Sequence, residues 1–190
     1  MEMILVVPSE KLAPYLKEDG LTRGCEQELY ALVEQEHLFL PRPAAEVDPS
    51  YRQIICYITL LRGDEVFCTR RLSKGTETRL QGRLSLGLGG HINDSDDQGD
   101  AGEIFRRGLE RELHEEADYT PAGELVPLGV IKDDSTEVGL VHMGFAFTLE
   151  VTDAHIRETE KLEGFWMKRG DYPSLRDQFE SWSQIVMDAM

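Results

Sequence analysis

The segment 109–119, "LERELHEEADY", gathers four glutamates, at positions 110, 112, 115 and 116. Residues three and four positions apart are neighbours on a helix, so these like charges repel one another unless something compensates them. A hard divalent cation such as Mg²⁺ takes oxygen ligands and commonly sits between carboxylates and the phosphates of a substrate. A divalent metal ion is therefore the simplest compensation for this cluster.

The helix that carries these carboxylates is predicted over 103–117. At about 100° per residue, Glu112 and Glu116 point in the same direction as Phe105 and Leu109, towards the body of the protein. Partly desolvated carboxylates cost several kcal/mol unless cations or hydrogen bonds compensate them. Ion pairs with arginines of the same helix are the purely structural alternative, but they do not explain two glutamates beside apolar side chains. The opposite arc reads as a solvated face and carries Arg106, Arg107, Glu110 and His114.

The residues around this cluster resemble the Nudix box. That pattern is a Gly, five residues, Glu, seven residues, Arg-Glu, an apolar residue, any residue, Glu-Glu, any residue, Gly and an apolar residue. The matched positions are Glu103, Arg111, Glu112, Leu113, Glu115 and Glu116. The sequence "GGHI" precedes them at the end of a predicted strand, and six matches in register are far more specific than a lone glycine motif.

The chain departs from the box in two places. Gly90 and Glu103 are separated by twelve residues in place of five, and Asp97 stands where the strict spacing wants Gly, so 93–102 reads as a solvated acidic insertion. Asp118 replaces the last Gly, and Asp tolerates the left-handed conformation better than most residues. These departures bear on the shape of the loop and on substrate choice more than on the metal site.

The resemblance implies an α/β/α sandwich with a mixed sheet. It also implies hydrolysis of a pyrophosphate bond in a nucleoside diphosphate linked to another group, or in a related organic diphosphate, with Mg²⁺ or Mn²⁺. Arg111 would orient a glutamate, and Glu103 would have a structural role at the start of the helix, where a negative charge suits the helix dipole. The implied metal ligands are Glu112, Glu115, Glu116 and the backbone carbonyl of Gly90.

The sequence does not determine which residue acts as the general base. A metal clamp would neutralise the pyrophosphate while an activated water attacks one phosphorus, and Glu115 or Glu116 could help to deprotonate that water. In related enzymes the base can come from a later loop. The candidates there are Glu137, Glu158, Glu160 and Glu163.

Substrate phosphates need cationic contacts, and Arg70, Arg71 and Lys74 are candidates for them. An ordinary surface role for these three residues is an equally good alternative. His91 could face the site or cap a strand, while His142, in an apolar strand, reads as a core histidine. Aromatic residues that could stack on a base are equally good core residues. They are Tyr57, Phe145, Phe147, Phe165 and Trp166.

Three other readings compete. A Nudix-like nucleotide-binding or regulatory module without catalysis would be expected to have lost box glutamates, and this chain keeps all of them. Isomerase chemistry on an isoprenoid diphosphate would need a suitable cysteine, for which Cys68 is the candidate. A calcium loop begins well at Asp94 and Asp96, but Phe105 stands where its closing Glu should be, so that reading fails.

The elements that must position these residues follow from periodicity and turn signals. Strands are predicted over 3–7, 54–61 and 66–72, the last two as a hairpin, with the first hairpin strand covered on both faces. Helices are predicted over 25–36 and 103–117, and a C-terminal helix begins near Pro173. Further strands are expected in "RLSLGLGGHI", "ELVPLGVIKDD", "VGLVHMGFAFTLEV" and "KLEGFWMKRGDY". We expect an N-terminal extension over 1–50, with a linker at 40–50, and a Nudix domain over 51–190.

Composition limits the partners. The 36 acidic and 20 basic residues give a net charge of -16, which disfavours nucleic acid and anionic membranes and favours a small nucleotide or diphosphate substrate. The three cysteines form no CxxC pair, and the chain shows no segment typical of a signal peptide, so a cytoplasmic protein is expected. A homodimer is a further expectation, from base rates alone.

Overall fold

The computed structural model describes residues 1–72, 82–97, 99–157 and 159–190. Its strands form one mixed sheet in the order β10-β5-β4-β9-β8-β2. Strands β4 and β9 are parallel, and the other pairs along this path are antiparallel. Their bounds are Gly20–Thr22 for β2, Tyr51–Arg62 for β4, Glu65–Arg71 for β5, Ala117–Lys132 for β8, His142–Ile156 for β9 and Leu162–Lys168 for β10.

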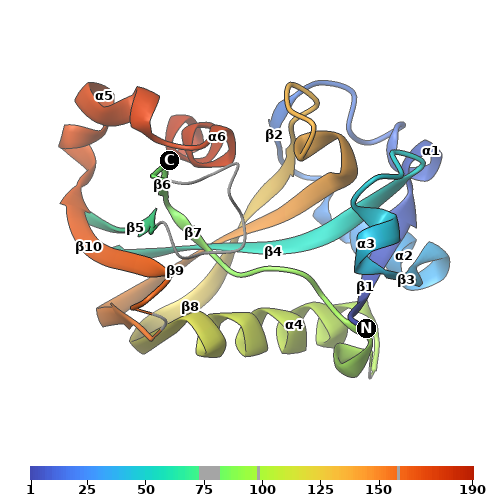
Figure 1. The fold of residues 1–190 in the computed structure, drawn as a ribbon, viewed down its shortest axis with the longest axis horizontal. Coiled ribbons are helices and arrows are strands. Elements are labelled where there is room, and N and C mark those ends of the chain that lie inside the picture. Colours follow the sequence, from blue (N-terminus) through green and yellow to red (C-terminus); the bar gives the residue numbers. More distant parts are fainter. Residues whose placement is uncertain (73–81, 98, 158) are drawn as a thin grey trace.

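Strand β4 organises the sheet (Figure 1). One of its edges pairs with β9 along most of its length, from Gln53 opposite His142 onwards. The other edge is shared in turn by β1 (Met3–Pro8), β7 (Gly87–Leu88) and β5. Nearly every side chain from Gln53 to Leu61 is buried, as expected for a strand that is covered on both faces.

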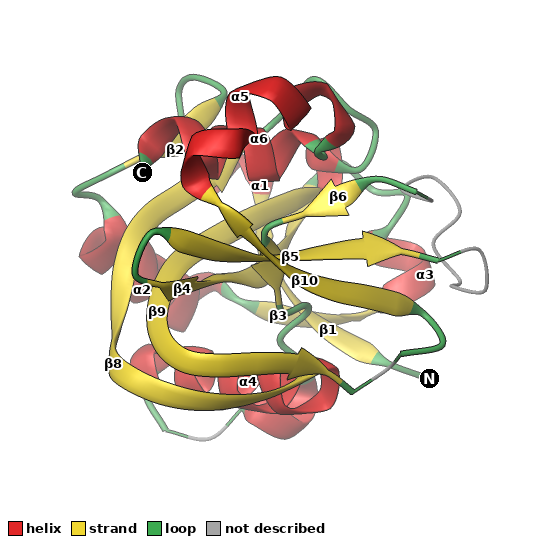
Figure 2. Ribbon diagram, turned by 90° about the vertical axis from the view of Figure 1, so that its left-hand side faces the viewer, coloured by secondary structure: helices red, strands yellow, loops and turns green. Residues whose placement is uncertain are grey.

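Helices cover both faces of the sheet, which confirms the predicted α/β/α class. Figures 1 and 2 show α4 (Ala101–Glu116) on one face and α5 (Tyr172–Leu175) and α6 (Ser181–Ala189) on the other. Helix α2 (Glu26–Glu36) packs beside α4, where the ring of Tyr30 lies 4.9 Å from the rings of both Phe105 and Phe145. The apolar side of α4 thus faces the sheet, and its other side faces solvent.

The first fifty residues share this sheet and core. Leu5 and Val7 of β1 and Leu29 and Val33 of α2 are fully buried in the same apolar cluster as Leu113 of α4. The predicted linker at 40–50 contains regular structure. The remaining elements of this region are α1 (Ser9–Leu12), β3 (Leu38–Pro41) and α3 (Arg42–Ala45).

None of the helices that the structure describes is long and apolar enough to span a membrane.

One expectation about local structure is wrong. The single C-terminal helix is broken between α5 and α6 by a short 3₁₀ turn (Arg176–Gln178) and by Phe179, which is extended and buried. Phe179 joins the apolar cluster that contains Tyr172 and Leu84, and the N–H of Glu180 donates to the carbonyl of Leu84 at 3.0 Å. Burying this ring requires a backbone direction that a continuous helix would not supply.

The acidic insertion is largely exposed to solvent, as expected, but it contains an ordered turn. Asp94–Asp96 form a 3₁₀ turn that Asn93 caps with its side chain. Asp96 closes the same turn by accepting from the N–H of Asn93 at 3.0 Å, and its side chain is buried. Segment 93–97 therefore delivers a carboxylate into the interior.

Candidate active site

A single cleft of about 940 Å³ gathers most of the residues that the sequence selects. Its walls come from the last turns of α4, the segment 87–91 (the glycine segment), the segment 133–141 (the β8–β9 loop) and the start of α6. The predicted site residues that line it are Arg71, Gly90, Arg111, Glu112, Glu115, Glu116 and Glu137. Sequence segments that are far apart thus meet around one space.

Glu112 is a partly buried carboxylate of this cleft. Its side chain is 17% exposed and accepts from Nη1 of Arg111 at 2.7 Å. Burial raises the pKa of the Glu112 carboxyl, and the hydrogen bond from Arg111 opposes that rise. The carboxylate also packs on Gly90, where a Cβ atom would lie 2.5 Å from Oε2 of Glu112. Only a glycine leaves room for this approach.

Glu116 and Glu115 differ in their surroundings. Oε2 of Glu116 accepts from the N–H of Gly89 at 2.9 Å, so this carboxylate is anchored to the glycine segment. The side chain of Glu115 is 62% exposed and lies 3.5 Å from Nη1 of Arg111. The carbonyl of Gly90 accepts from the N–H of Cys56 at 3.0 Å and has a second lone pair for another partner.

These donors fit a hard cation in chemistry, because all of them are carboxylate or carbonyl oxygens, the ligands of Mg²⁺ and Mn²⁺. The oxygen atoms do not converge on one point, because among the described residues no three His, Cys, Asp or Glu side chains form a group that could hold a metal ion. The raised pKa of the partly buried Glu112 is what a carboxylate shows when its charge lacks full compensation. A cation at this wall would supply that compensation.

Arg111 is held by a carboxylate that sequence reasoning missed. Asp96 accepts from Nε of Arg111 at 3.1 Å and from Nη2 at 2.8 Å, a two-pronged contact. Nη2 also donates to the carbonyl of His91 at 2.9 Å. Asp96 lies within the acidic insertion, and no periodic pattern in the sequence links it to a residue fifteen positions later. The insertion thus fixes the arginine that contacts Glu112.

Glu103 lies on the solvent side of α4. Its Oε2 accepts from Nη2 of Arg106 at 2.8 Å and lies 3.8 Å from Nε of Arg107. The N-cap of the helix is Asp100, whose side chain accepts from the N–H of Glu103 at 3.0 Å. Glu103 therefore occupies the first turn, where a negative charge suits the helix dipole.

The predicted phosphate-binding cations separate. Arg71, at the end of β5, lines the cleft, whereas Arg70 is not among the lining residues and pairs with Glu163 at 3.2 Å. Lys74 lies outside the described residues. Lys161, which sequence reasoning did not select, lines the cleft beside Arg71, since the N–H of Leu72 donates to the carbonyl of Lys161 at 2.8 Å. Alternation along β5 explains why only one of two neighbouring arginines can face the cleft.

The candidate bases separate in the same way. Glu137, on the β8–β9 loop, lines the cleft, whereas neither Glu160 nor Glu163 does. Glu158 lies outside the described residues.

Both histidines border the cleft. His91 is partly buried, its Nε2 lies 2.8 Å from Oε1 of Gln53, and burial, together with the nearby charges of Arg42 and Arg111, lowers its pKa to about 3. It is therefore neutral at pH 7. Nδ1 of His142 lies 2.6 Å from the carbonyl of Val138, so this residue helps to close the β8–β9 loop, a role that core burial alone does not describe.

Aromatic side chains reach the cleft at one end. Tyr57 and Trp182 line it, with ring centroids 5.8 Å apart. Phe145 and Phe147 are buried in the core, and Phe165 and Trp166 of β10 pack against apolar clusters away from the cleft. Trp182 was overlooked because a tryptophan on an amphipathic C-terminal helix reads as an ordinary core residue.

Cys68 does not reach the cleft, which removes the support for the isomerase reading. It is fully buried in β5 among apolar residues, and burial raises the pKa of its thiol to about 12. We expect Cys68→Ala to leave hydrolysis unchanged and native Cys68 to resist thiol reagents at pH 8, because the thiolate is the reactive form. Peptide mapping after labelling checks this, with the urea-unfolded chain as the control. Rapid native labelling would contradict the assignment.

Gly89 has a backbone that no other residue adopts easily. Its φ is +121°, and an added Cβ would lie 2.2 Å from the carbonyl oxygen of Cys56. We expect Gly89→Ala to destabilise the protein by about 2 kcal/mol or more in urea unfolding, since strain of this kind costs about 1–3 kcal/mol before the clash is counted.

The matched control for this change is Gly170→Ala, where an added Cβ meets nothing within 4 Å. Its effect should stay within about 0.5 kcal/mol. Equal effects at the two positions would show that the glycine segment can relax.

Comparison with known proteins gives two matches that cover almost the whole chain. No family model matches the chain. It is 34% identical over 203 residues to protein YmaB of Bacillus subtilis (strain 168), which covers 100% of this chain and 97% of YmaB. The crystal structure of Tm1382, described as a candidate Nudix hydrolase, matches with a TM-score of 0.86 and 31% identity over 98% of this chain and 97% of Tm1382.

More distant structures agree in fold alone. The NUDIX domain of Shewanella oneidensis NrtR, solved with ADP ribose, matches with a TM-score of 0.56 and 13% identity, over 73% of this chain and 85% of that domain. The MutT NUDIX hydrolase of Burkholderia pseudomallei gives 0.52 and 15%, over 73% and 98%. The match to Tm1382 covers almost the whole chain and confirms the resemblance that six positions of α4 indicate, so the protein belongs to the Nudix hydrolase family.

Proposed function

We propose that this protein hydrolyses the pyrophosphate bond of a nucleoside diphosphate linked to another group, or of a related organic diphosphate, with Mg²⁺ or Mn²⁺. The observation that carries the proposal is the composition of one cleft. Three carboxylates of α4 and the carbonyl of Gly90 lie on one wall, and Arg71, Lys161 and Glu137 line the same space. Such a site can neutralise a diphosphate and accept a proton from water.

In the proposed mechanism Glu112, Glu115 and Glu116, with the carbonyl of Gly90, hold the cation. When bound, the cation supplies Lewis-acid stabilisation of the charge on the diphosphate. Arg71 and Lys161 contact phosphate oxygens. Arg111 keeps Glu112 in place through the 2.7 Å hydrogen bond.

Glu137 is the proposed general base. It lies on the β8–β9 loop, while Glu112 and Glu116 are already engaged with Arg111 and with the N–H of Gly89. A base must lie within hydrogen-bond reach of the attacking water, directly or through one further water. Glu137 would take the proton of that water as the oxygen attacks one phosphorus and the other phosphate leaves.

The deciding experiment is a turnover assay with Mg²⁺ on a panel of compounds. The panel contains ADP-ribose, which the NrtR domain binds, other nucleoside diphosphate derivatives, dinucleoside polyphosphates and nucleoside triphosphates. Release of two phosphorylated products from one of the first three classes supports the proposal and names the substrate. Metal and nucleotide binding without turnover would favour the alternative of a non-hydrolytic binding or regulatory module.

Arg71 and Arg70 offer a matched pair for testing phosphate contact. We expect Arg71→Met to raise KM about tenfold with a smaller change in kcat, because a hydrogen bond to a charged group is worth about 1.5–3 kcal/mol. Arg70→Met should leave KM unchanged, since Arg70 pairs with Glu163 and does not line the cleft. Steady-state kinetics check both variants. Equal increases in KM would mean that general surface charge, and not a placed arginine, attracts the substrate.

A further inference from the structure

The β8–β9 loop is a tightly bonded turn. The N–H and the hydroxyl of Ser135 donate to Oδ1 of Asp133, at 3.1 and 2.5 Å, and the N–H of Gly139 donates to the hydroxyl of Thr136 at 2.9 Å. The N–H of Leu140 donates to the carbonyl of Thr136 at 3.0 Å. These bonds fix the shape of the loop, but they do not fix where the loop stands relative to the sheet.

Arg52 supplies that connection. Its Nη1 donates to the carbonyl of Gly139 at 2.6 Å and to that of His142 at 3.4 Å, and its Nη2 donates to Oδ1 of Asp134 at 2.7 Å. Its side chain is 13% exposed. Arg52 lies on β4, the strand on which the glycine segment also docks. One guanidinium thus ties both ends of the β8–β9 loop to the strand on which the glycine segment docks.

We propose that Arg52 is a positioning residue that holds Glu137 at its working place in the cleft. The inference rests on the proposed function, because it takes Glu137 as the group that accepts the proton of water. A planar guanidinium can hold two acceptors in a fixed geometry, whereas an ammonium is a point charge on a flexible stem. A misplacement of about 1 Å can lower a rate about a hundredfold, so a tether of this kind controls kcat.

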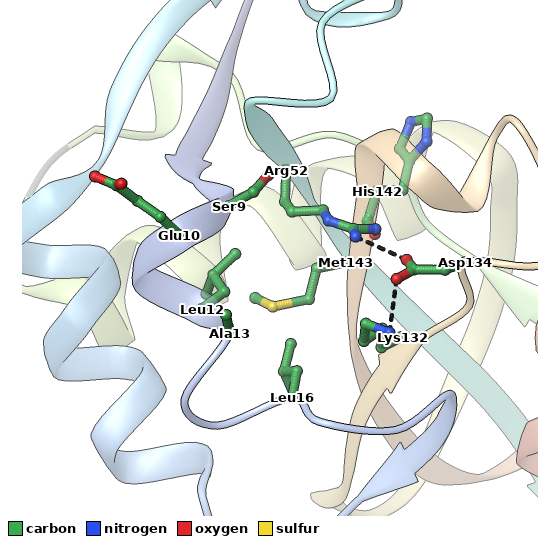
Figure 3. Close-up of a pocket in the computed structure, with 10 residues that line it drawn as sticks. All are labelled: Ser9, Glu10, Leu12, Ala13, Leu16, Arg52, Lys132, Asp134, His142 and Met143. Atoms are coloured by element: carbon green, nitrogen blue, oxygen red, sulfur yellow. Dashed lines mark hydrogen bonds and ion pairs between the residues drawn. The ribbon is translucent and has the colours of Figure 1, made fainter.

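A small pocket beside Arg52 makes a chemical test available. It has a volume of about 320 Å³ and is separate from the active-site cleft, although His142 borders both. Figure 3 shows the guanidinium of Arg52 at the edge of this pocket, with Asp134 between it and Lys132. Removing the Arg52 side chain would enlarge a space that already exists, so a small guanidinium ion can enter from solution.

A double-mutant cycle tests the proposal on the substrate that the panel identifies. We expect Arg52→Ala to lower kcat by about ten- to a hundredfold with little change in KM, and to lower it by less than about twofold in a Glu137→Gln background. Arg52→Lys should recover only part of the loss, and millimolar ethylguanidinium should restore activity to Arg52→Ala. Equal losses in both backgrounds would overturn the proposal, because Arg52 would then act independently of Glu137.

Hydrogen exchange provides a readout that does not depend on turnover. In Arg52→Ala the amides of Gly139 and Leu140 should exchange at least about tenfold faster, with urea unfolding measured alongside to subtract any global loss. Lys132→Met is the matched control, because Lys132 pairs with Asp134 at 2.7 Å, whereas Arg52 also donates to the carbonyls of Gly139 and His142. Unchanged exchange in Arg52→Ala would overturn the tether.

The two failures are distinguishable. A wild-type protein that hydrolyses nothing in the panel defeats the proposed function, while the exchange experiment still decides whether Arg52 holds the loop. If the wild-type protein hydrolyses a compound of the panel and the Glu137→Gln variant keeps full activity, the proposed role of Glu137 is wrong. The proposed role of Arg52 is then wrong as well.

Discussion

Glu112→Gln is expected to lower kcat/KM for the diphosphate substrate by about 10³-fold or more, without lowering the stability of the metal-free protein. A cation that polarises the substrate is worth several kcal/mol in the transition state, and about 1.4 kcal/mol corresponds to tenfold in rate. The amide keeps the volume of Glu112 and an acceptor for Nη1 of Arg111, but it removes the negative charge. Activity and stability should therefore separate.

The stability half of this prediction follows from the direction of the pKa shift. Burial raises the folded-state pKa of Glu112 above its ordinary value of 4.5. A raised carboxyl pKa means that the folded state binds the proton more tightly, so stability falls as pH rises from about 4.5 through the folded-state pKa. Glu112→Gln lacks this fall. Urea unfolding of both proteins at pH 4.5 and pH 7.5, without metal, measures the difference.

Glu110→Gln is the matched control, because Glu110 lies on the solvent side of the same helix and pairs with Arg106 at 2.7 Å. It should keep full activity. Hydrolysis by Glu112→Gln at the wild-type rate would remove Glu112 from the proposed ligand set, and a large drop in its stability would show that its charge is already compensated in the folded protein.

Asp96→Asn is expected to destabilise the protein by about 3 kcal/mol and to lower activity about ten- to a hundredfold. Breaking a buried ion pair from one side costs about 3–5 kcal/mol, and the lower end applies because Arg111 is partly exposed. The amide nitrogen of Asn would face the guanidinium, which has no acceptor to offer. Arg111 would then no longer fix Glu112, and loss of an outer partner of a metal ligand typically costs about ten- to a hundredfold.

Glu103→Gln is the comparison that makes this result specific. Glu103 is a box residue, but it pairs with Arg106 at the surface, and such pairs are worth about 0–1 kcal/mol. Urea unfolding and kinetics on both variants decide between them. If Glu103→Gln proved the more damaging, the box glutamate and not the insertion would be what supports Arg111.

The sequence was sufficient for the helix and for the cleft wall that it forms. A spacing of four residues puts Glu112 and Glu116 on one side of any helix, and the order of the apolar and polar residues shows which side faces the sheet. The glycines before the helix could be related to it because the Nudix box joins the two, even with an insertion between them. Local periodicity and a motif carry this much information.

Contacts between distant segments could not be predicted in the same way. Asp96 meets Arg111 only because a capped turn folds the insertion back onto α4. Lys161 reaches the cleft because its segment is hydrogen-bonded to the end of β5. Phe179 interrupts the C-terminal helix because a buried site for its ring exists beside Leu84. Each depends on packing between segments, and a one-dimensional pattern does not encode it.

The shared edge of β4 has a consequence for synthesis on the ribosome. Segments up to the glycine segment can fill one edge of the strand early, but the other edge waits for β9, where Gln53 meets His142. Until then the nascent chain presents an apolar strand with open backbone groups, the kind of edge that recruits other chains. Helix α4 is made before this edge is closed, so the incomplete protein exposes the open strand while the box glutamates are already present and Lys161 is still to be made.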